Sequence, residues 1–149
     1  MARKHDPDQL RRVAMVCDVK TTAAKLDAAR AARDAAQSAA ELQQSKARRG
    51  ATEDGWRAAI ESPPIATDRI ALWSSALRRS EREVMQASRD ALAAEQELAS
   101  RSAAFHASSK RGEIVHDLVA QSQRDARTKR DESAMQQSLD MISQRKAVE

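Results

Sequence analysis

The chain has very few of the residues from which a compact hydrophobic core is built. Its 149 residues include no tyrosine, one phenylalanine and two tryptophans, so aromatic residues make up only 2% of the total. Glycine and proline occur three times each, whereas alanine, arginine, glutamate, glutamine and leucine are abundant. This composition is typical of long helices and coiled coils rather than of a globular domain.

Cysteine and long hydrophobic runs are also scarce. Cys17 has no second cysteine with which to form an intramolecular disulfide, which agrees with a reducing compartment. The apolar run from Val13 to Cys17 is too short for a signal peptide, and no segment approaches the length of a membrane span. We therefore expect a cytoplasmic protein that does not insert directly into a membrane.

A repeat of seven residues, uninterrupted by proline, runs from Ile70 to Ala126. Its first set of positions, a, contains Ile70, Leu77, Val84, Ala91, Leu98, Phe105, Gly112, Val119 and Ala126. Its second set, d, contains Trp73, Ser80, Ala87, Ala94, Arg101, Ser108, Val115 and Ser122. Such a repeat keeps one seam of an α-helix against a partner as the two supercoil. At about 1.5 Å per residue, the segment would be roughly 85 Å long, which indicates an elongated all-α coiled coil.

A first helix is predicted at about residues 7–48. Asp6 can cap it, Pro7 suits its first position, and Gly50 is a natural stop. Its predicted contact stripe contains Ala24, Ala28, Ala31, Ala35, Ser38 or Ala39, and Leu42, preceded by Leu10, Val13, Val16 and Val19. Because alanine buries little area, we expect a weakly held pair of helices.

A connecting segment at 49–66, with room for a short helix at 53–61, is predicted to lead into a second helix at about 67–143. Pro63-Pro64 prevents the first helix from continuing. The simplest architecture is a single antiparallel two-helix coiled coil, a helical hairpin with a longer second helix. In this arrangement the first helix covers the second only to about residue 108. Roughly 35 further residues then lack cover, which predicts a partner because helices owe most of their stability to packing.

No catalytic, cofactor-binding or metal-binding constellation is recognisable. His5, His106 and His116 are not spaced as metal ligands, and no cysteine pair accompanies them. Lys20-Thr21 lacks the glycine-rich turn of a phosphate-binding loop. We therefore expect no enzymatic activity and no cofactor.

Pairs of basic residues are scattered along the chain, and each lies near an acid. They are Arg11-Arg12, Arg48-Arg49, Arg78-Arg79, Lys110-Arg111 and Lys129-Arg130. A nucleic-acid-binding protein normally gathers its bases on one face or interleaves them with aromatic residues. Since this chain does neither and its net charge is only +4, we expect no nucleic-acid partner and keep that function as a less favoured alternative.

The two tryptophans stand out in a chain with so few aromatic residues. Trp56 and Trp73 either close the end of the hairpin as a small hydrophobic cluster or form an exposed anchor, since tryptophan is enriched at binding hot spots. The candidate partner-binding residues at this tip are Trp56, Arg57, Trp73 and Leu77.

Three segments follow a known pattern. They are Trp56-Arg57 followed by Glu61 and Ile65, the segment 68–83 (DRIALWSSALRRSERE), and the segment 129–134 (KRDESA). In these segments and in its two-helix organisation, the chain resembles the FliJ/YscO family of small coiled-coil proteins of bacterial flagellar and type III secretion export. The likeness is closer to the YscO/HrpO-like injectisome branch, although Pro63-Pro64 departs from the family pattern.

The resemblance implies a non-enzymatic role similar to that of the central stalk of rotary ATPases. It implies three partners, namely the export ATPase hexamer, the export gate protein and the secretion chaperones. It also implies a monomer in the bacterial cytoplasm, peripheral to the export apparatus at the inner membrane. The candidate residues for the ATPase-binding end are Arg124, Arg127, Lys129, Arg130, Asp131 and Glu132.

The alternative from a different class is a generic structural coiled-coil scaffold that acts as a homodimer. Its size in solution at micromolar concentration would separate it from the monomeric stalk.

Overall fold

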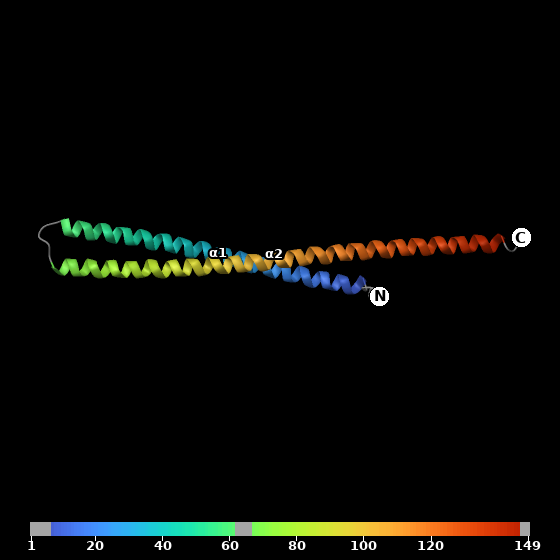
Figure 1. Cartoon of the computed structure of the whole chain (residues 1–149), viewed down its shortest axis with the longest axis horizontal. Helices are drawn as coiled ribbons and strands as arrows, with labels where there is room; N and C mark the ends of the chain where they lie inside the picture. The colour runs from blue at the N-terminus through green and yellow to red at the C-terminus, as the bar shows by residue number, and fades with distance from the viewer. Residues whose placement is uncertain (1–6, 62–66, 147–149) are drawn as a thin grey trace. The chain divides into compact units, whose positions relative to one another are not determined.

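The described residues, 7–61 and 67–146, are entirely helical in the computed structural model of the chain. Helix α1 spans Pro7–Glu61 with 55 residues, and helix α2 spans Thr67–Lys146 with 80 residues (Figure 1). The two helices pack against each other in opposite directions. The predicted all-α antiparallel helical hairpin with a longer second helix is therefore confirmed.

Contacts within the chain divide it into two units, and each contains a stretch of both helices. Unit 1 joins residues 1–23 to residues 106–149, and unit 2 comprises residues 24–105. Each unit therefore pairs a part of α1 with a part of α2.

The predicted seven-residue repeat is the contact face of α2. In unit 2, all its a and d positions from Ile70 to Phe105 are buried or half-buried, except Arg101, which is exposed. In unit 1, the same holds for every a and d position from Ser108 to Ala126. The heptad frame read from the sequence is thus confirmed for both units.

The contact face of α1 follows a repeat of seven as well. In unit 1 its a positions are Ala14 and Thr21, and its d positions are Leu10 and Cys17. In unit 2 its a positions are Ala28, Ala35, Leu42, Arg49 and Trp56. Its d positions there are Ala24, Ala31, Ser38, Ser45, Thr52 and Ala59. The stripe predicted from Ala24 to Leu42 is confirmed. Among the described residues, the hydrophobic side chains that are buried all belong to alanine, namely Ala14, Ala31, Ala35 and Ala91, and these keep 6–8% of their surface exposed. The core is consequently thin.

The predicted end of the first helix near residue 48 is wrong, because α1 continues through Gly50 to Glu61. A glycine inside a helix costs only about 1 kcal/mol relative to alanine. Beyond it, Thr52 and Trp56 stay on the contact face and pack there. The segment 53–61 is therefore the last part of α1 rather than a separate short helix.

The predicted start of the second helix at residue 67 agrees with Thr67, and α2 extends slightly past residue 143, to Lys146. The predictions for Asp6 and for Pro63-Pro64 lie outside the described residues.

The longer α1 also changes how much of α2 is covered. The predicted limit of cover near residue 108 is wrong, since half-buried seam positions continue in unit 1 to Ala126. The side chains at 127–142 are all exposed. The stretch of α2 without cover is thus shorter than predicted and begins later.

The three valines that precede the predicted stripe do not lie on the contact face of α1. Val13, Val16 and Val19 are 47–70% exposed, whereas Ala14 and Cys17 take the seam. The seven-residue frame explains the difference, because extending it from Ala24 and Ala28 toward the start of α1 selects Cys17 and Ala14 instead of the valines.

Candidate partner-binding sites

The two tryptophans lie close to the end of the hairpin in unit 2, and both take seam positions. Trp73 lies across Gly55, where an added Cβ atom would be within 3.0 Å of several atoms of the indole ring. Trp56, one residue further along α1, is half-buried. This packing agrees with the hydrophobic cluster considered above, whereas contact of either tryptophan with a partner stays a prediction.

The exposed part of the tip lies on α1. Arg57 is exposed and pairs with Asp54 across 3.5 Å, one turn earlier on the same helix. A shallow hollow beside it is lined by Glu53, Trp56, Arg57, Ile60 and Glu61. Trp56 therefore has one edge that a partner can reach, and Ile60, which the sequence analysis missed, adds an exposed apolar side chain to it.

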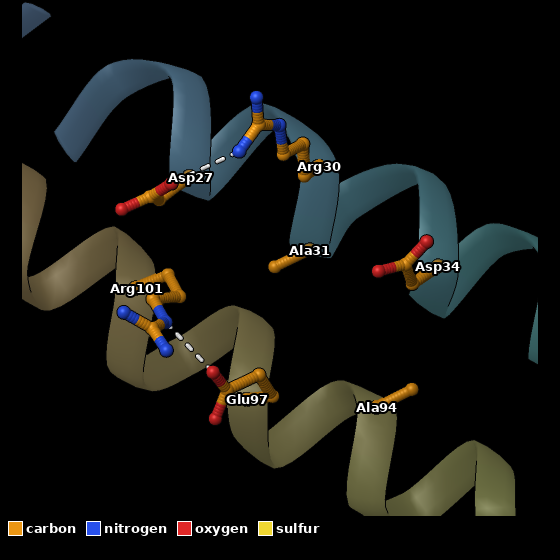
Figure 2. A pocket seen from close by; sticks show the side chains of 7 residues that line it. All are labelled: Asp27, Arg30, Ala31, Asp34, Ala94, Glu97 and Arg101. Atoms are coloured by element: carbon orange, nitrogen blue, oxygen red, sulfur yellow. Dashed lines mark hydrogen bonds and ion pairs between the residues drawn. The ribbon is translucent and has the colours of Figure 1, made fainter. Parts of the chain in front are cut away.

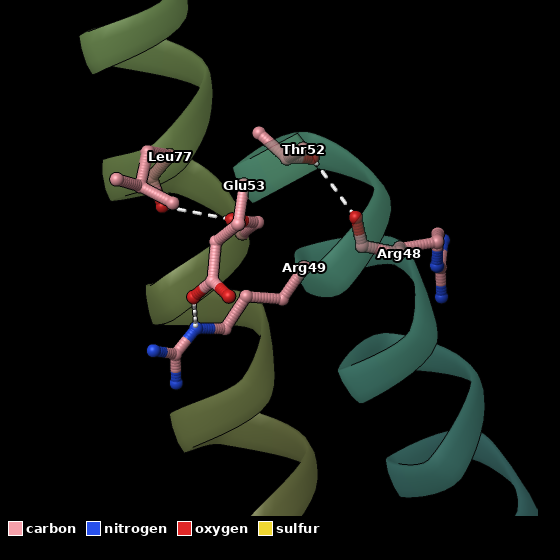
Figure 3. Close-up of polar contacts among 6 residues, drawn as sticks. Arg48, Arg49, Thr52, Glu53 and Leu77 are labelled. Atoms are coloured by element: carbon pink, nitrogen blue, oxygen red, sulfur yellow. Dashed lines mark hydrogen bonds and ion pairs between the residues drawn. The ribbon is translucent and has the colours of Figure 1, made fainter. Parts of the chain in front are cut away.

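Leu77 lies beside a polar layer of the seam (Figure 3). Its carbonyl oxygen accepts a hydrogen bond of 2.8 Å from the buried hydroxyl of Ser80. On α1, the Arg49 Nε donates to Glu53 across 2.7 Å, and the Thr52 hydroxyl donates to the carbonyl of Arg48. Leu77 is half-buried, so of the four predicted tip residues only Arg57 is fully available to a partner.

A charged hollow of about 410 Å³ lies between the two helices of unit 2 (Figure 2). It is lined by Asp27, Arg30, Ala31 and Asp34 of α1 and by Ala94, Glu97 and Arg101 of α2. The Arg101 Nε donates to Glu97 across 2.7 Å, and this bond, together with the charges of Glu97 and Asp27, raises the pKa of Arg101 above its ordinary value.

The charges of this hollow are solvated rather than buried. Arg101 occupies a d position but is exposed, and its hydrogen-bond partner Glu97 lies on the same helix. The charge of Asp27, on the opposite helix, acts on Arg101 more weakly than Glu97 does. Exposed charges of this kind contribute little to stability, so the hollow is a charged surface between the two helices.

The six residues predicted for the ATPase-binding end are all exposed on α2 in unit 1: Arg124, Arg127, Lys129, Arg130, Asp131 and Glu132. Five of them lie beyond Ala126, the last half-buried position. The structure thus brings them together on one stretch of helix and leaves their side chains accessible.

Two polar contacts join the helices of unit 1. The hydroxyl groups of Thr21 and Ser108 are hydrogen-bonded at 3.0 Å in the seam, and His116 Nε2 lies 2.8 Å from an Asp18 carboxylate oxygen on its flank. Gly112 lies opposite Thr21, and an added Cβ would be 3.7 Å from the threonine hydroxyl, an ordinary contact. An alanine at this position would therefore fit without moving either helix.

The exposed large hydrophobic side chains gather in unit 1, which contains the part of the second helix for which the sequence predicted a partner. Unit 1 contains Val13, Met15, Val16, Val19, Ile114, Leu118, Met135, Leu139, Met141 and Ile142, whereas the larger unit 2 contains Leu26, Ile60, Leu72, Met85 and Leu92. The signal was present in the sequence as apolar residues off the seven-residue frame. An apolar concentration of this kind is typical of an interaction surface.

Neither a metal-ligand cluster nor a membrane-spanning helix occurs among the described residues. Within residues 7–61 and 67–146, no three His, Cys, Asp or Glu side chains are grouped so that they could hold a metal ion. Neither helix, over the same residues, has a stretch apolar enough to cross a membrane. Comparison with protein-family models, curated proteins and solved structures gives no match to this chain.

Proposed function

We propose that the chain is a non-enzymatic component of a bacterial type III protein export apparatus. In this proposal it acts as a central stalk: unit 1 engages the export ATPase hexamer, and the tip in unit 2 contacts the export gate protein and the secretion chaperones. The proposal places the protein in the bacterial cytoplasm, peripheral to the export apparatus.

The observation that carries the proposal is the concentration of exposed apolar and basic side chains in unit 1. Exposed apolar residues there outnumber those of unit 2. The exposed bases Arg124, Arg127, Lys129 and Arg130 follow within a few residues. A surface that combines apolar anchors with arginine is typical of protein interfaces, and it coincides with the segment that the family resemblance assigns to the ATPase.

The seam also suits a stalk. Among the described residues, its buried hydrophobic side chains are all alanine, and small side chains let two helices pack closely without deep interlocking. Such a pair presents a narrow cross-section to the pore of a ring.

The ATPase rate of the cognate export ATPase, measured with and without this protein, tests the proposal. We expect sub-stoichiometric amounts to raise both hexamer formation and turnover. The triple variant Arg127→Ala, Lys129→Ala, Arg130→Ala should lose most of this effect, because it removes three exposed bases from the engaged segment.

The matched control is the triple variant Arg78→Ala, Arg79→Ala, Arg82→Ala. It removes the same charge from exposed positions of α2 in unit 2. We expect it to stimulate the ATPase as the native chain does. If the native chain neither binds the ATPase nor changes its rate, the proposed function is wrong.

A structural scaffold that acts as a homodimer is the second candidate function. The exposed apolar side chains of unit 1 favour it, because a second copy of the chain could cover them. The ATPase assay separates the two functions, since a scaffold leaves the ATPase unchanged whatever its own oligomeric state.

A further inference from the structure

Unit 1 carries two separate exposed apolar surfaces. The first, the paired-helix face, consists of Val13 and Val16 on α1 and Ile114 and Leu118 on α2, which are 47–60% exposed. The second, the α2 stripe, consists of Met135, Leu139 and Ile142, which are 54–65% exposed. Within each set, residues of the same helix are three or four apart, so they share one side of that helix.

The heptad frame places both halves of the paired-helix face on the same flank of unit 1. Asp18 and His116 each follow a d position, and they meet at 2.8 Å, so positions after d mark one flank. Val13 and Leu118 each precede an a position and therefore lie on the opposite flank. Val16 and Ile114 lie beside them, one turn away on their helices.

Unit 2 independently shows that side chains preceding an a position meet on one flank. Asp27 and Asp34 precede a positions of α1, and Glu97 precedes an a position of α2. All three line the same hollow together with Arg101 (Figure 2). The rule used for the paired-helix face is therefore observed in this coiled coil.

The register of unit 1 also brings the two halves to the same level. Thr21 is hydrogen-bonded to Ser108, and Asp18 meets His116 two turns further along α2. Val16 and Val13 come before Asp18 on α1, and in this register Val16 lies level with Ile114 and Val13 with Leu118, each to within about a turn. The four side chains thus form one apolar face across both helices.

The charges around the two surfaces are complementary. The flank of the paired-helix face carries the bases Arg12, Lys20, Lys110, Arg111 and Arg124 and the acids Asp117 and Asp125. On the α2 stripe, Asp131 and Glu132 come four and three residues before Met135, on the same side of the helix. The stripe therefore presents acids followed by apolar anchors to a face that is apolar with basic borders.

We propose that the free chain forms a closed antiparallel dimer in which the α2 stripe of each copy covers the paired-helix face of the other. Met135 and Leu139, four residues apart, then meet Leu118 and Ile114, also four apart. Each stripe becomes a third helix on its partner's pair, as amphipathic helices do when they bind to apolar faces.

The antiparallel direction follows from closure and charge. In this direction Asp131 and Glu132 fall between the levels of Arg12 and Arg124, whose side chains can reach them. A two-fold axis makes the contact reciprocal, so both copies are satisfied and growth stops at two. Parallel docking would leave one stripe and one face free at the ends, and assembly would continue.

This inference does not rest on the proposed function, and it replaces the monomer that the family resemblance implies for the free chain. The dimer covers part of the surface that the stalk role requires, so a dimer would have to separate before unit 1 entered the ATPase. A chain that stays monomeric would overturn the dimer but would not change the outcome expected in the ATPase assay. Likewise, a chain that fails to stimulate the ATPase would overturn the proposed function but not the dimer.

Sedimentation equilibrium of the full chain, without ATPase, tests the dimer directly. Over loading concentrations of about 1 to 100 µM, a range in which modest interfaces associate, we expect the mass to rise from the 16.4 kDa of one chain to twice that value and then to stop. A mass of one chain throughout, or a mass that keeps rising beyond the dimer, would overturn the proposal.

The variant Met135→Ser, Leu139→Ser should raise the dissociation constant at least about tenfold, as expected for the loss of two anchors. Both side chains are exposed within one copy, so the variant should keep its helix content. The matched control, Leu72→Ser, Met85→Ser, changes the same residue types at similar exposure in unit 2 and should dimerise normally. Equal weakening by both variants would contradict the assigned surface.

Charge reversal tests the direction of the contact. The variant Asp131→Arg, Glu132→Arg should weaken the dimer, and adding Arg12→Glu, Arg124→Glu to the same chain should restore it. Restoration by Lys20→Glu, Arg111→Glu in their place would indicate parallel docking and would overturn the closed dimer.

Discussion

Replacing Gly55 with alanine tests how closely the two helices of unit 2 approach each other near the tip. Trp73 lies directly across this glycine, and an added Cβ would come within 3.0 Å of several atoms of its indole ring. Such distances are shorter than carbon atoms adopt in packed interiors. The indole must therefore move, or the two helices must separate at this point.

The expected effect is a balance of two opposing terms. Alanine improves on glycine by about 1 kcal/mol in the interior of a helix. Overpacking a contact, with displacement of the larger side chain, costs about 1–3 kcal/mol. We therefore expect Gly55→Ala to lower the free energy of unfolding by about 1 kcal/mol. At Gly50 no atom lies within 4 Å of an added Cβ, so Gly50→Ala should raise it by up to about 1 kcal/mol.

Thermal and urea unfolding followed by circular dichroism measure both variants. A change of 1 kcal/mol corresponds to a shift of roughly 2–4 °C in Tm for a chain of this size. In a Trp56→Phe background, the fluorescence of Trp73 reports separately whether its ring has become more exposed. If Gly55→Ala and Gly50→Ala stabilise the chain equally and the emission of Trp73 does not change, the argument from close approach is refuted.

Three further predictions concern the seam, and each is measured by urea unfolding. Gly112→Ala should raise the free energy of unfolding by up to about 1 kcal/mol, because its Cβ would lie 3.7 Å from Thr21 without crowding it; a loss would indicate closer packing. Thr21→Val and Ser108→Ala should each cost about 1 kcal/mol, and together less than their sum, since each alone leaves the other hydroxyl without its partner; simple additivity would contradict this. Arg49→Leu should raise the free energy of unfolding by about 1 kcal/mol, because an apolar side chain replaces a charged one in the seam. Unchanged stability would show that the ion pair between Arg49 and Glu53 stabilises the chain as much as the apolar side chain does.

The seam of α2 could be predicted from the sequence because it depends on local spacing alone. From Ile70 to Ala126, a repeat of seven selects the side that faces a partner, whatever that partner is. The one exposed position, Arg101, carries a long charged side chain that can leave the seam and bond to Glu97. Local pattern thus accounts for the fold class and for nearly all contact positions.

The end of α1 could not be predicted from the same local signals. Three basic residues lie in the turn before Gly50, which therefore looks like a C-terminal stop. The stop fails because the repeat of seven continues past it through Thr52 and Trp56, and packing on α2 outweighs a propensity cost of about 1 kcal/mol. Extending the repeat of seven from Leu42 selects Arg49 and Trp56, and so predicts a helix that continues past the apparent stop at Gly50. Helix ends in a coiled coil therefore depend on the partner helix as well as on local signals.

The candidate sites were harder to predict from the sequence. An exposed face that spans two helices is defined only once the pairing of those helices is known. Val13 and Val16 look like core residues on a single helix, and only the contact between Asp18 and His116 shows which flank they occupy. The tip residues also depend on how the two helices pair. Trp73 looks like a binding anchor by residue type, but it is held against Gly55 within unit 2.

The thin seam and the exposed surfaces of unit 1 have a common physical cause. The contact between its helices is made by small residues such as Ala14 and Gly112, which are buried but contribute little apolar area. Large apolar side chains such as Val13, Ile114 and Leu118 lie exposed outside the seam, where they stabilise the helices only when another helix covers them. A third helix, from a second copy or from another protein, would therefore add apolar burial that the pair itself lacks. Since anything that binds the folded form raises its stability, we expect binding and folding to be coupled in unit 1.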